Sequence, residues 1–97
     1  LDVVKVLDIT EATHIEREMM LVKVQATSGE SREEYKRLTD IFRGRVLDVT
    51  EKAYTIELTG TSSKLDAFLE VIGHKTPVEV VRSGVIGIGR GDKQMRI

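Results

Sequence analysis

The 97-residue sequence predicts an α+β fold whose elements follow the order strand, helix, strand, strand, helix, strand. Two stretches carry apolar residues at helical spacing, and each lies between stretches that are rich in valine, isoleucine and leucine. Hydrophobic residues make up 40% of the chain and charged residues 32%, which is typical of one folded domain rather than of a disordered chain. The chain has no cysteine, so a disulfide framework, a thiolate zinc site and a cysteine nucleophile are excluded.

The first helix is predicted to begin at Ser31 and to end at Gly44. The Ser31 hydroxyl can cap the helix start, and Glu34, three positions later, completes a capping box. Gly44 can adopt the left-handed conformation that closes a helix. The stripe that must face a sheet consists of Tyr35, Leu38, Ile41 and Phe42.

The second helix is predicted to begin at Ser63, with Asp66 as the capping-box partner, and to end at Gly73. Pro77 prevents the helix from continuing. Its core stripe consists of Leu65, Phe68, Leu69 and Ile72.

Four strands are predicted around these helices, at residues 18–26, 45–50, 53–59 and 78–88. Residues 51–52 are expected to form a short hairpin, and Gly84 a bulge in the last strand. Each half of the chain is a strand-helix-strand crossover, and right-handed crossovers place both helices on one face. The predicted fold is therefore a ferredoxin-like βαββαβ sandwich with a four-stranded antiparallel sheet. The opposite face of the sheet stays available to a second copy or a partner.

The two ends of the chain are expected to lie outside this sandwich. Residues 1–10 are predicted to form a strand that belongs either to a preceding domain or to the edge of this one, followed by a polar connector through His14. The residues after Gly89 show no periodicity, and residues 90–97 are predicted to be a flexible tail.

The sequence offers few groups for catalysis or for metal and phosphate binding. His14 and His74 are expected in solvent, since neither has an acidic or serine partner in a recognisable arrangement. Residues 16–18 form a charge cluster that suggests a surface salt bridge or an interface. The glycine alternation at residues 87–91 precedes no helix, which argues against a phosphate loop.

Charge and aromatic placement also disfavour nucleic-acid and membrane partners. The net charge is −1, and most aromatic residues fall on the predicted helix stripes, so RNA binding through exposed strand aromatics is disfavoured. No apolar run approaches the ~20 residues needed to cross a bilayer, and no secretory signal pattern occurs. We expect a cytoplasmic location.

Several segments then resemble a known family. The strings EREMMLVKV, RLTDIFRGRVLDVT, YTIELTGTSSKLDAFL and VVRSGVIGIGRG closely resemble the small regulatory subunit of acetohydroxyacid synthase (acetolactate synthase). In that family an N-terminal ACT domain precedes a C-terminal ACT-like domain of ferredoxin-like fold. The resemblance implies three segments: the last strand of the ACT domain and a linker at 1–15, the C-terminal ACT-like regulatory domain at 16–89, and the tail at 90–97.

The resemblance also implies a function. The small subunit is a non-catalytic partner that activates the catalytic subunit and confers feedback inhibition, most often by valine, in branched-chain amino-acid biosynthesis. Thiamine diphosphate, magnesium and flavin are expected on the catalytic subunit, with no cofactor in this chain, and the small subunits are expected to form a homodimer. The family's valine site lies in the ACT domain, so no valine-binding residue carries over to residues 1–97.

Two sets of residues are predicted to bind other molecules. Arginines near turns suit carboxylate pairing at an interface, although such arginines can equally be solvated: Arg43, Arg45, Arg82 and Arg90. The turn formed by Thr27, Ser28 and Gly29 could hold the carboxylate of a small effector through its backbone amides. The alternative function is therefore a small-effector-binding ACT-like module that acts on another partner.

Overall fold

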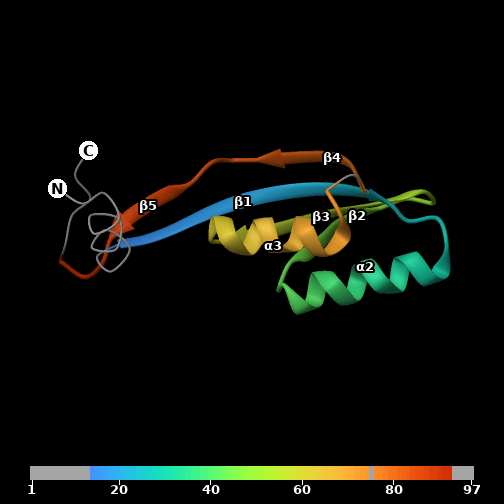
Figure 1. Ribbon diagram of the computed structural model, residues 1–97, viewed down its shortest axis with the longest axis horizontal. Helices are drawn as coiled ribbons and strands as arrows, with labels where there is room; N and C mark the ends of the chain where they lie inside the picture. The colour runs from blue at the N-terminus through green and yellow to red at the C-terminus, as the bar shows by residue number, and fades with distance from the viewer. Residues whose placement is uncertain (1–13, 75, 93–97) are drawn as a thin grey trace.

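The computed structural model describes residues 14–74 and 76–92, so the predicted strand at 1–10 and the end of the predicted tail lie outside the described part (Figure 1). The described elements are β1 (His14–Gln25), α2 (Gly29–Ile41), β2 (Arg45–Val49), β3 (Ala53–Gly60), α3 (Ser62–Ile72), β4 (Pro77–Arg82) and β5 (Ile86–Gly89). The predicted α+β class and ferredoxin-like order of elements are confirmed.

The sheet is antiparallel and has the strand order β2-β3-β1-β4, with β5 paired to the first part of β1. In β1 the even-numbered residues Met20, Val22 and Val24 are fully buried, while Met19 is exposed. Val22 lies opposite Ile56 of β3, so the buried residues of neighbouring strands share one face. This alternation gives the sheet an apolar inner face and a partly exposed outer face.

Both helices cover the inner face (Figure 1). Leu65 and Phe68 of α3 are fully buried against the sheet. Phe42, directly after α2, meets the Phe68 ring edge to face, with 5.2 Å between the ring centroids. Tyr35, Leu38, Leu69 and Ile72 also pack on this core, as predicted, but Ile41 is 64% exposed and does not belong to it.

Both helices begin earlier than the sequence predicts. Ser28 rather than Ser31 caps α2, and Ser31 serves as the capping-box partner: each hydroxyl accepts a hydrogen bond from the other residue's amide, at 3.0 and 3.2 Å. Thr61 rather than Ser63 caps α3 by accepting from the Lys64 amide. Each start contains several serines and threonines, any of which can cap a helix, so the sequence signal fixes the start only to within a turn.

The end of α2 also differs from the prediction. Arg43, not Gly44, adopts the left-handed conformation, with φ of 58°. Gly44 is required for a different reason: a Cβ there would lie 2.6 Å from Leu58 Cδ1 and 2.7 Å from the Glu57 carbonyl oxygen. The close approach of this corner to β3 therefore needs glycine at position 44. At the end of α3, Gly73 has φ of 89° and caps the helix as predicted.

The predicted last strand is in fact two strands. Gly84 has φ of 85°, and the segment between β4 and β5 interrupts the ladder. Because β1 is longer than predicted, reaching back to His14, it pairs with β4 along one half and with β5 along the other. β1 and β5 thus form a two-stranded arm that extends beyond α3 (Figure 1).

The hairpin at residues 51–52 closes without glycine or asparagine. The Thr50 hydroxyl accepts hydrogen bonds from the amides of Lys52 and Ala53, at 3.2 and 3.0 Å. The threonine side chain thereby takes the part that a turn-forming residue would play. No helix in the described part is long and apolar enough to cross a membrane.

Candidate functional site

A buried carboxylate and an arginine form the most highly connected polar cluster of the described chain. Glu18 Oε1 and Oε2 accept hydrogen bonds from Arg82 Nη2 and Nε, at 2.7 and 3.2 Å. The second terminal nitrogen of Arg82 donates to Asp66 Oδ1 at 2.6 Å. Ser62 Oγ donates to Glu18 Oε1, at 3.1 Å. The cluster joins β1, β4 and the first turns of α3.

These contacts shift the ionisation of both central groups. The hydrogen bonds from Arg82 lower the pKa of Glu18, and this effect outweighs desolvation, which would raise it. The carboxylates of Glu18 and Asp66 in turn raise the pKa of Arg82 above its usual range. Both groups therefore stay charged at neutral pH, as a buried ion pair requires.

The cluster also bonds the segment that connects β4 and β5. The Gly84 amide donates to Glu18 Oε2 at 3.2 Å, and the Ser83 amide donates to the Met19 carbonyl at 2.9 Å. The Ser83 hydroxyl accepts a hydrogen bond from the Met19 amide at 3.0 Å. Donors that the interrupted ladder leaves without a strand partner thus find acceptors on β1. Arg82, predicted as an interface residue, is bonded within the chain, and its contacts favour a structural role.

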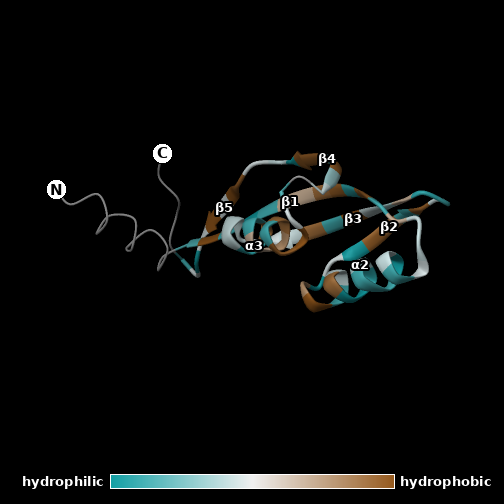
Figure 2. Cartoon of the chain, turned by 45° about the vertical axis from the view of Figure 1, so that its right-hand side comes forward, coloured by the Kyte–Doolittle hydropathy of each residue, from teal (hydrophilic) through white to brown (hydrophobic). Residues whose placement is uncertain are grey.

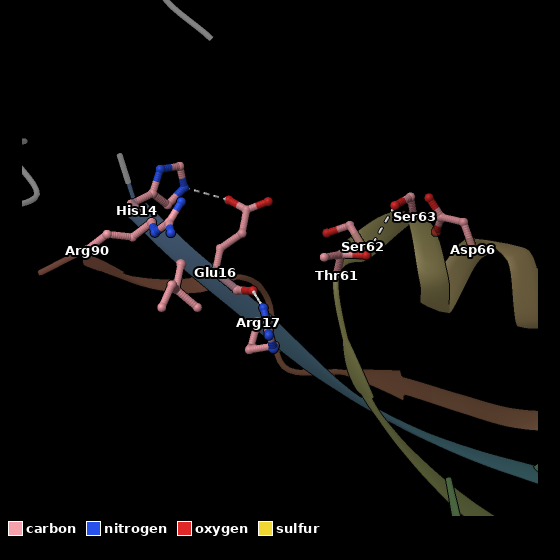
Figure 3. A pocket seen from close by; sticks show the side chains of 9 residues that line it. His14, Glu16, Arg17, Thr61, Ser62, Ser63, Asp66 and Arg90 are labelled. Carbon is pink, nitrogen blue, oxygen red and sulfur yellow. Dashed lines mark hydrogen bonds and ion pairs between the residues drawn. The ribbon is translucent and has the colours of Figure 1, made fainter. Parts of the chain in front are cut away.

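An open hollow of about 770 Å³ lies between the β1–β5 arm and the start of α3 (Figure 3). Side chains from the two sides stand across the gap from one another (Figure 3). It is lined by His14, Ile15, Glu16, Arg17, Thr61, Ser62, Ser63, Asp66 and Arg90. Arg90, another predicted interface residue, thus faces the hollow rather than the region of Arg43.

The hollow has mixed charge, and several of its polar groups are already bonded. His14 is only 8% exposed and its Nε2 lies 3.1 Å from Glu16 Oε2, so the expectation of a solvated His14 is wrong. Arg17 donates to the Glu16 carbonyl at 2.7 Å, and the hydroxyls of Thr61 and Ser63 lie 3.1 Å apart. The described residues contain no group of three or more histidine or acidic side chains able to hold a metal ion.

The predicted effector turn is part of the cap of α2. The Ser28 amide and hydroxyl are used by the capping box, and Gly29 is the first residue of the helix. The adjoining groove, of about 320 Å³, is lined by Ser28, Glu30, Ser31, Glu34, Tyr35, Leu38, Val71 and Ile72. The two glutamates would repel the carboxylate of an amino acid. The geometry therefore gives little support to effector binding at Thr27, Ser28 and Gly29.

Arg43 and Arg45 lie at the corner between α2 and β2. The edge of the sheet formed by β2 is opposite the edge formed by β4, which carries Arg82. The Arg45 side chain is 76% exposed and donates to Glu57 Oε1 through Nη2 and Nε, at 2.8 and 3.1 Å. Arg43 is exposed and makes no side-chain hydrogen bond or ion pair within the described residues. The four predicted interface arginines therefore do not form one surface.

The outer face of the sheet carries exposed apolar side chains. Leu21 of β1 lies opposite Val81 of β4, which is 54% exposed, and Met19 beside them is 43% exposed. Two neutral ion pairs, Lys23–Glu79 and Arg45–Glu57, lie on the same face. Further exposed apolar residues on the arm are Ile15, Ile86 and Ile88.

Sequence reasoning placed Glu18 in a surface charge cluster and missed its role. The signal was available, because Glu18 continues the even-numbered series of Met20, Val22 and Val24 that points to the core. A charge in a buried series requires a partner of opposite charge. The identity of that partner, Arg82, depends on strand pairing over 64 residues and could not be read from local sequence.

Comparison with known proteins gives a consistent result. The family model described as the small subunit of acetolactate synthase matches residues 17–91. The chain is 56% identical over 96 residues to the acetolactate synthase isozyme 3 small subunit of Escherichia coli K12, covering 98% of this chain and 58% of that protein. It is 53% identical over 95 residues to the acetolactate synthase small subunit of Haemophilus influenzae, covering 97% and 58%.

A solved structure is also similar. The acetolactate synthase small subunit from Thermotoga maritima superposes with a TM-score of 0.76 at 28% sequence identity, covering 96% of this chain and 68% of that one. The chain thus spans a little over half the length of the curated relatives it matches.

Proposed function

Because the chain belongs to the family of acetolactate synthase small subunits, we propose that it is a non-catalytic regulatory module of an acetolactate synthase. It binds the catalytic subunit and raises its activity, and it helps to transmit feedback inhibition by valine. The observation that carries this proposal is the family match over residues 17–91, which begins within β1 and includes every later strand and helix through β5.

The surfaces of the domain fit a binding module. Its outer sheet face and its α2–β2 corner expose apolar and arginine side chains, which are enriched at protein interfaces. The catalytic chemistry, with thiamine diphosphate, magnesium and flavin, is assigned in this proposal to the catalytic subunit, and valine recognition to the family's ACT domain.

The proposal includes pairing of two regulatory subunits. The outer face has an apolar centre that lies between two ion pairs, each with a net charge of zero. A second copy related by a two-fold axis would therefore bring a positive and a negative charge together against each pair. Sedimentation analysis tests this: Val81→Asp, which places a charge in the centre, should convert a dimer to monomers. A wild-type chain that sediments as a monomer at every concentration contradicts the pairing.

The direct test is to titrate the isolated catalytic subunit with this chain and to measure acetolactate production with and without valine. Stimulation that does not respond to valine is the expected result, because activation is assigned to this domain and sensing to the ACT domain. Absence of both stimulation and binding would contradict the proposal.

Calorimetry of the chain alone with each branched-chain amino acid tests the alternative of a small-effector-binding module acting on another partner. The acidic groove beside Ser28 predicts no measurable heat. Saturable binding would favour the effector-binding function instead.

A further inference from the structure

We infer that Arg43 is a docking residue that recognises a carboxylate, from an aspartate or glutamate side chain, on the surface of the catalytic subunit. The inference rests on the proposed function and selects one of the four predicted interface arginines. It is carried by the bonding state of the side chain, by its backbone conformation and by the exposed apolar side chains on the two elements that flank it.

Arg43 differs from the other described arginines in its bonding. Five of them have an acceptor within the chain: Arg17 on the Glu16 carbonyl, Arg32 on the Thr50 carbonyl, Arg37 on Glu34, Arg45 on Glu57 and Arg82 on Glu18 and Asp66. Arg90 also has an interaction. Within residues 14–74 and 76–92, Arg43 alone presents a guanidinium group without an acceptor.

The backbone of Arg43 is unfavourable for any residue with a side chain. Its φ of 58° lies in the left-handed region, and it is the one described residue other than glycine to do so. A glycine at this position would close α2 with less strain. Glycine at the next position serves the separate need for close packing against Leu58. Retaining an arginine at position 43 therefore lowers stability, and functional sites are where such strain concentrates.

Exposed apolar side chains lie on both elements that flank Arg43. Ile41, at the end of α2, is 64% exposed, and Leu47 on the edge strand β2 is 51% exposed. Figure 2 shows that the last residues of α2 are hydrophobic. Arginine is one of the residue types enriched among those that dominate binding energy.

The chemistry of the partner group follows from charge. A guanidinium group offers a planar fork of donors that matches the two oxygens of a carboxylate. The charged residues nearest to Arg43 in the sequence are Asp40, Arg45 and Asp48. Neither aspartate forms an ion pair with Arg43. The acceptor is therefore expected on another molecule, and in this proposal that molecule is the catalytic subunit.

The test compares stability and binding in the same variants. Arg43→Gly should raise the melting temperature, by about 2–5 °C, because it relieves the left-handed strain. The same variant should weaken binding to the immobilised catalytic subunit at least about tenfold, because the charged contact is lost. A residue that serves only the fold cannot produce this pair of opposite changes.

Three further variants act as controls. Arg43→Asn tolerates the left-handed conformation without the charge, and it should fold like wild type but bind as weakly as Arg43→Gly. Arg43→Lys keeps the charge without the fork and should bind with intermediate affinity. Arg37→Gln removes the same charge from α2, where Arg37 lies 3.7 Å from Glu34, and should bind like wild type. Raising the salt concentration should weaken wild-type binding more than that of Arg43→Asn.

Two results overturn the inference and can be told apart. Wild-type affinity in both Arg43→Gly and Arg43→Asn would remove Arg43 from the interface and leave the proposed function standing. A wild-type chain that neither binds nor stimulates the catalytic subunit would overturn the inference together with the proposed function.

Discussion

The region around Arg82 and the corner around Arg43 place the same guanidinium group in opposite situations. Arg82 is bonded by two carboxylates, one of them buried, and joins two strands to a helix. Arg43 has an unfavourable backbone, an exposed side chain and no bonded acceptor among the described residues. The arrangement at Arg82 stabilises the fold, and the arrangement at Arg43 leaves a guanidinium group at the surface that can bind a partner.

The comparison shows why residue type alone does not identify an interface. Arginines near turns are common both in structural ion pairs and in docking surfaces. Two properties separate these classes of arginine: whether acceptors within the chain already bond the guanidinium N–H groups, and whether the backbone has a favourable conformation. Substitutions at Arg82, at Arg43 and at their neighbours test this distinction.

The largest expected effect comes from Arg82→Met, which leaves the buried Glu18 carboxylate without its cation. We expect the melting temperature to fall by about 10 °C or more, measured by circular dichroism. Adding Glu18→Gln to this variant should recover part of the loss, since the uncompensated charge is removed. A melting temperature of Arg82→Met within about 2 °C of wild type would contradict the structural role.

The second effect concerns the glycine beside Arg43. Gly44→Ala places a methyl group against Leu58 and the Glu57 carbonyl, and we expect unfolding to become easier by about 1–3 kcal/mol in urea titrations. The matched control is Gly29→Ala, whose added Cβ would meet no atom within 4 Å, and it should be at least as stable as wild type. Equal stability of the two variants would show that the corner can relax away from β3.

This corner also shows what local sequence could and could not predict. The strands predicted at residues 18–26 and 53–59 and the apolar stripe of α3 are confirmed, because burial periodicity is a local property of the chain. The end of α2 was assigned to Gly44 on the usual rule for helix ends. The structure instead places the left-handed residue at Arg43, and Gly44 serves the close approach to β3.

The errors in the last strand and in the polar cluster have the same origin. The sequence predicts one strand over residues 78–88. Its division at Gly84 depends on the length of β1, which pairs with β4 along one half and with β5 along the other. The Glu18–Arg82 pair depends on the same pairing, across distant positions of the chain. Tertiary pairing rather than residue propensity decides these features, so they could not be derived from local patterns.

A smaller effect should appear in the pH dependence of stability. The pKa of Glu18 is lower in the folded chain than its ordinary value near 4.5, so the unfolded chain takes up the proton first as pH falls. The contribution of Glu18 should be fully present above that value and lost as pH falls through the folded pKa. Glu18→Gln should therefore lose less unfolding free energy than wild type between pH 5 and pH 3, in urea titrations at each pH.

The opposite sign in this comparison, a steeper acid loss in Glu18→Gln, would contradict the assigned pairing. Other carboxylates titrate in the same range, which is why the variant and the wild-type chain must be compared at each pH rather than the wild-type curve read alone.

The smallest expected effect tests the other arginine of the α2–β2 corner. Arg45→Gln removes an ion pair with Glu57, but the Arg45 side chain is 76% exposed, and exposed pairs contribute only about 0.2–1 kcal/mol. The melting temperature should therefore change by no more than about 3 °C. Unlike Arg43, Arg45 has an acceptor within the chain and an extended backbone in β2, so its guanidinium group is not left for a partner.

Charge reversal at this position extends the comparison to function. If Arg43 alone carries the contact, Arg45→Glu should reduce stimulation of the catalytic subunit only slightly, through the long-range field that an exposed charge exerts in salt solution. A loss as large as that of Arg43→Asn would show that both arginines of the corner face the partner. Docking would then depend on where the corner lies in the fold. The absence of an acceptor within the chain would not be what identifies a docking arginine.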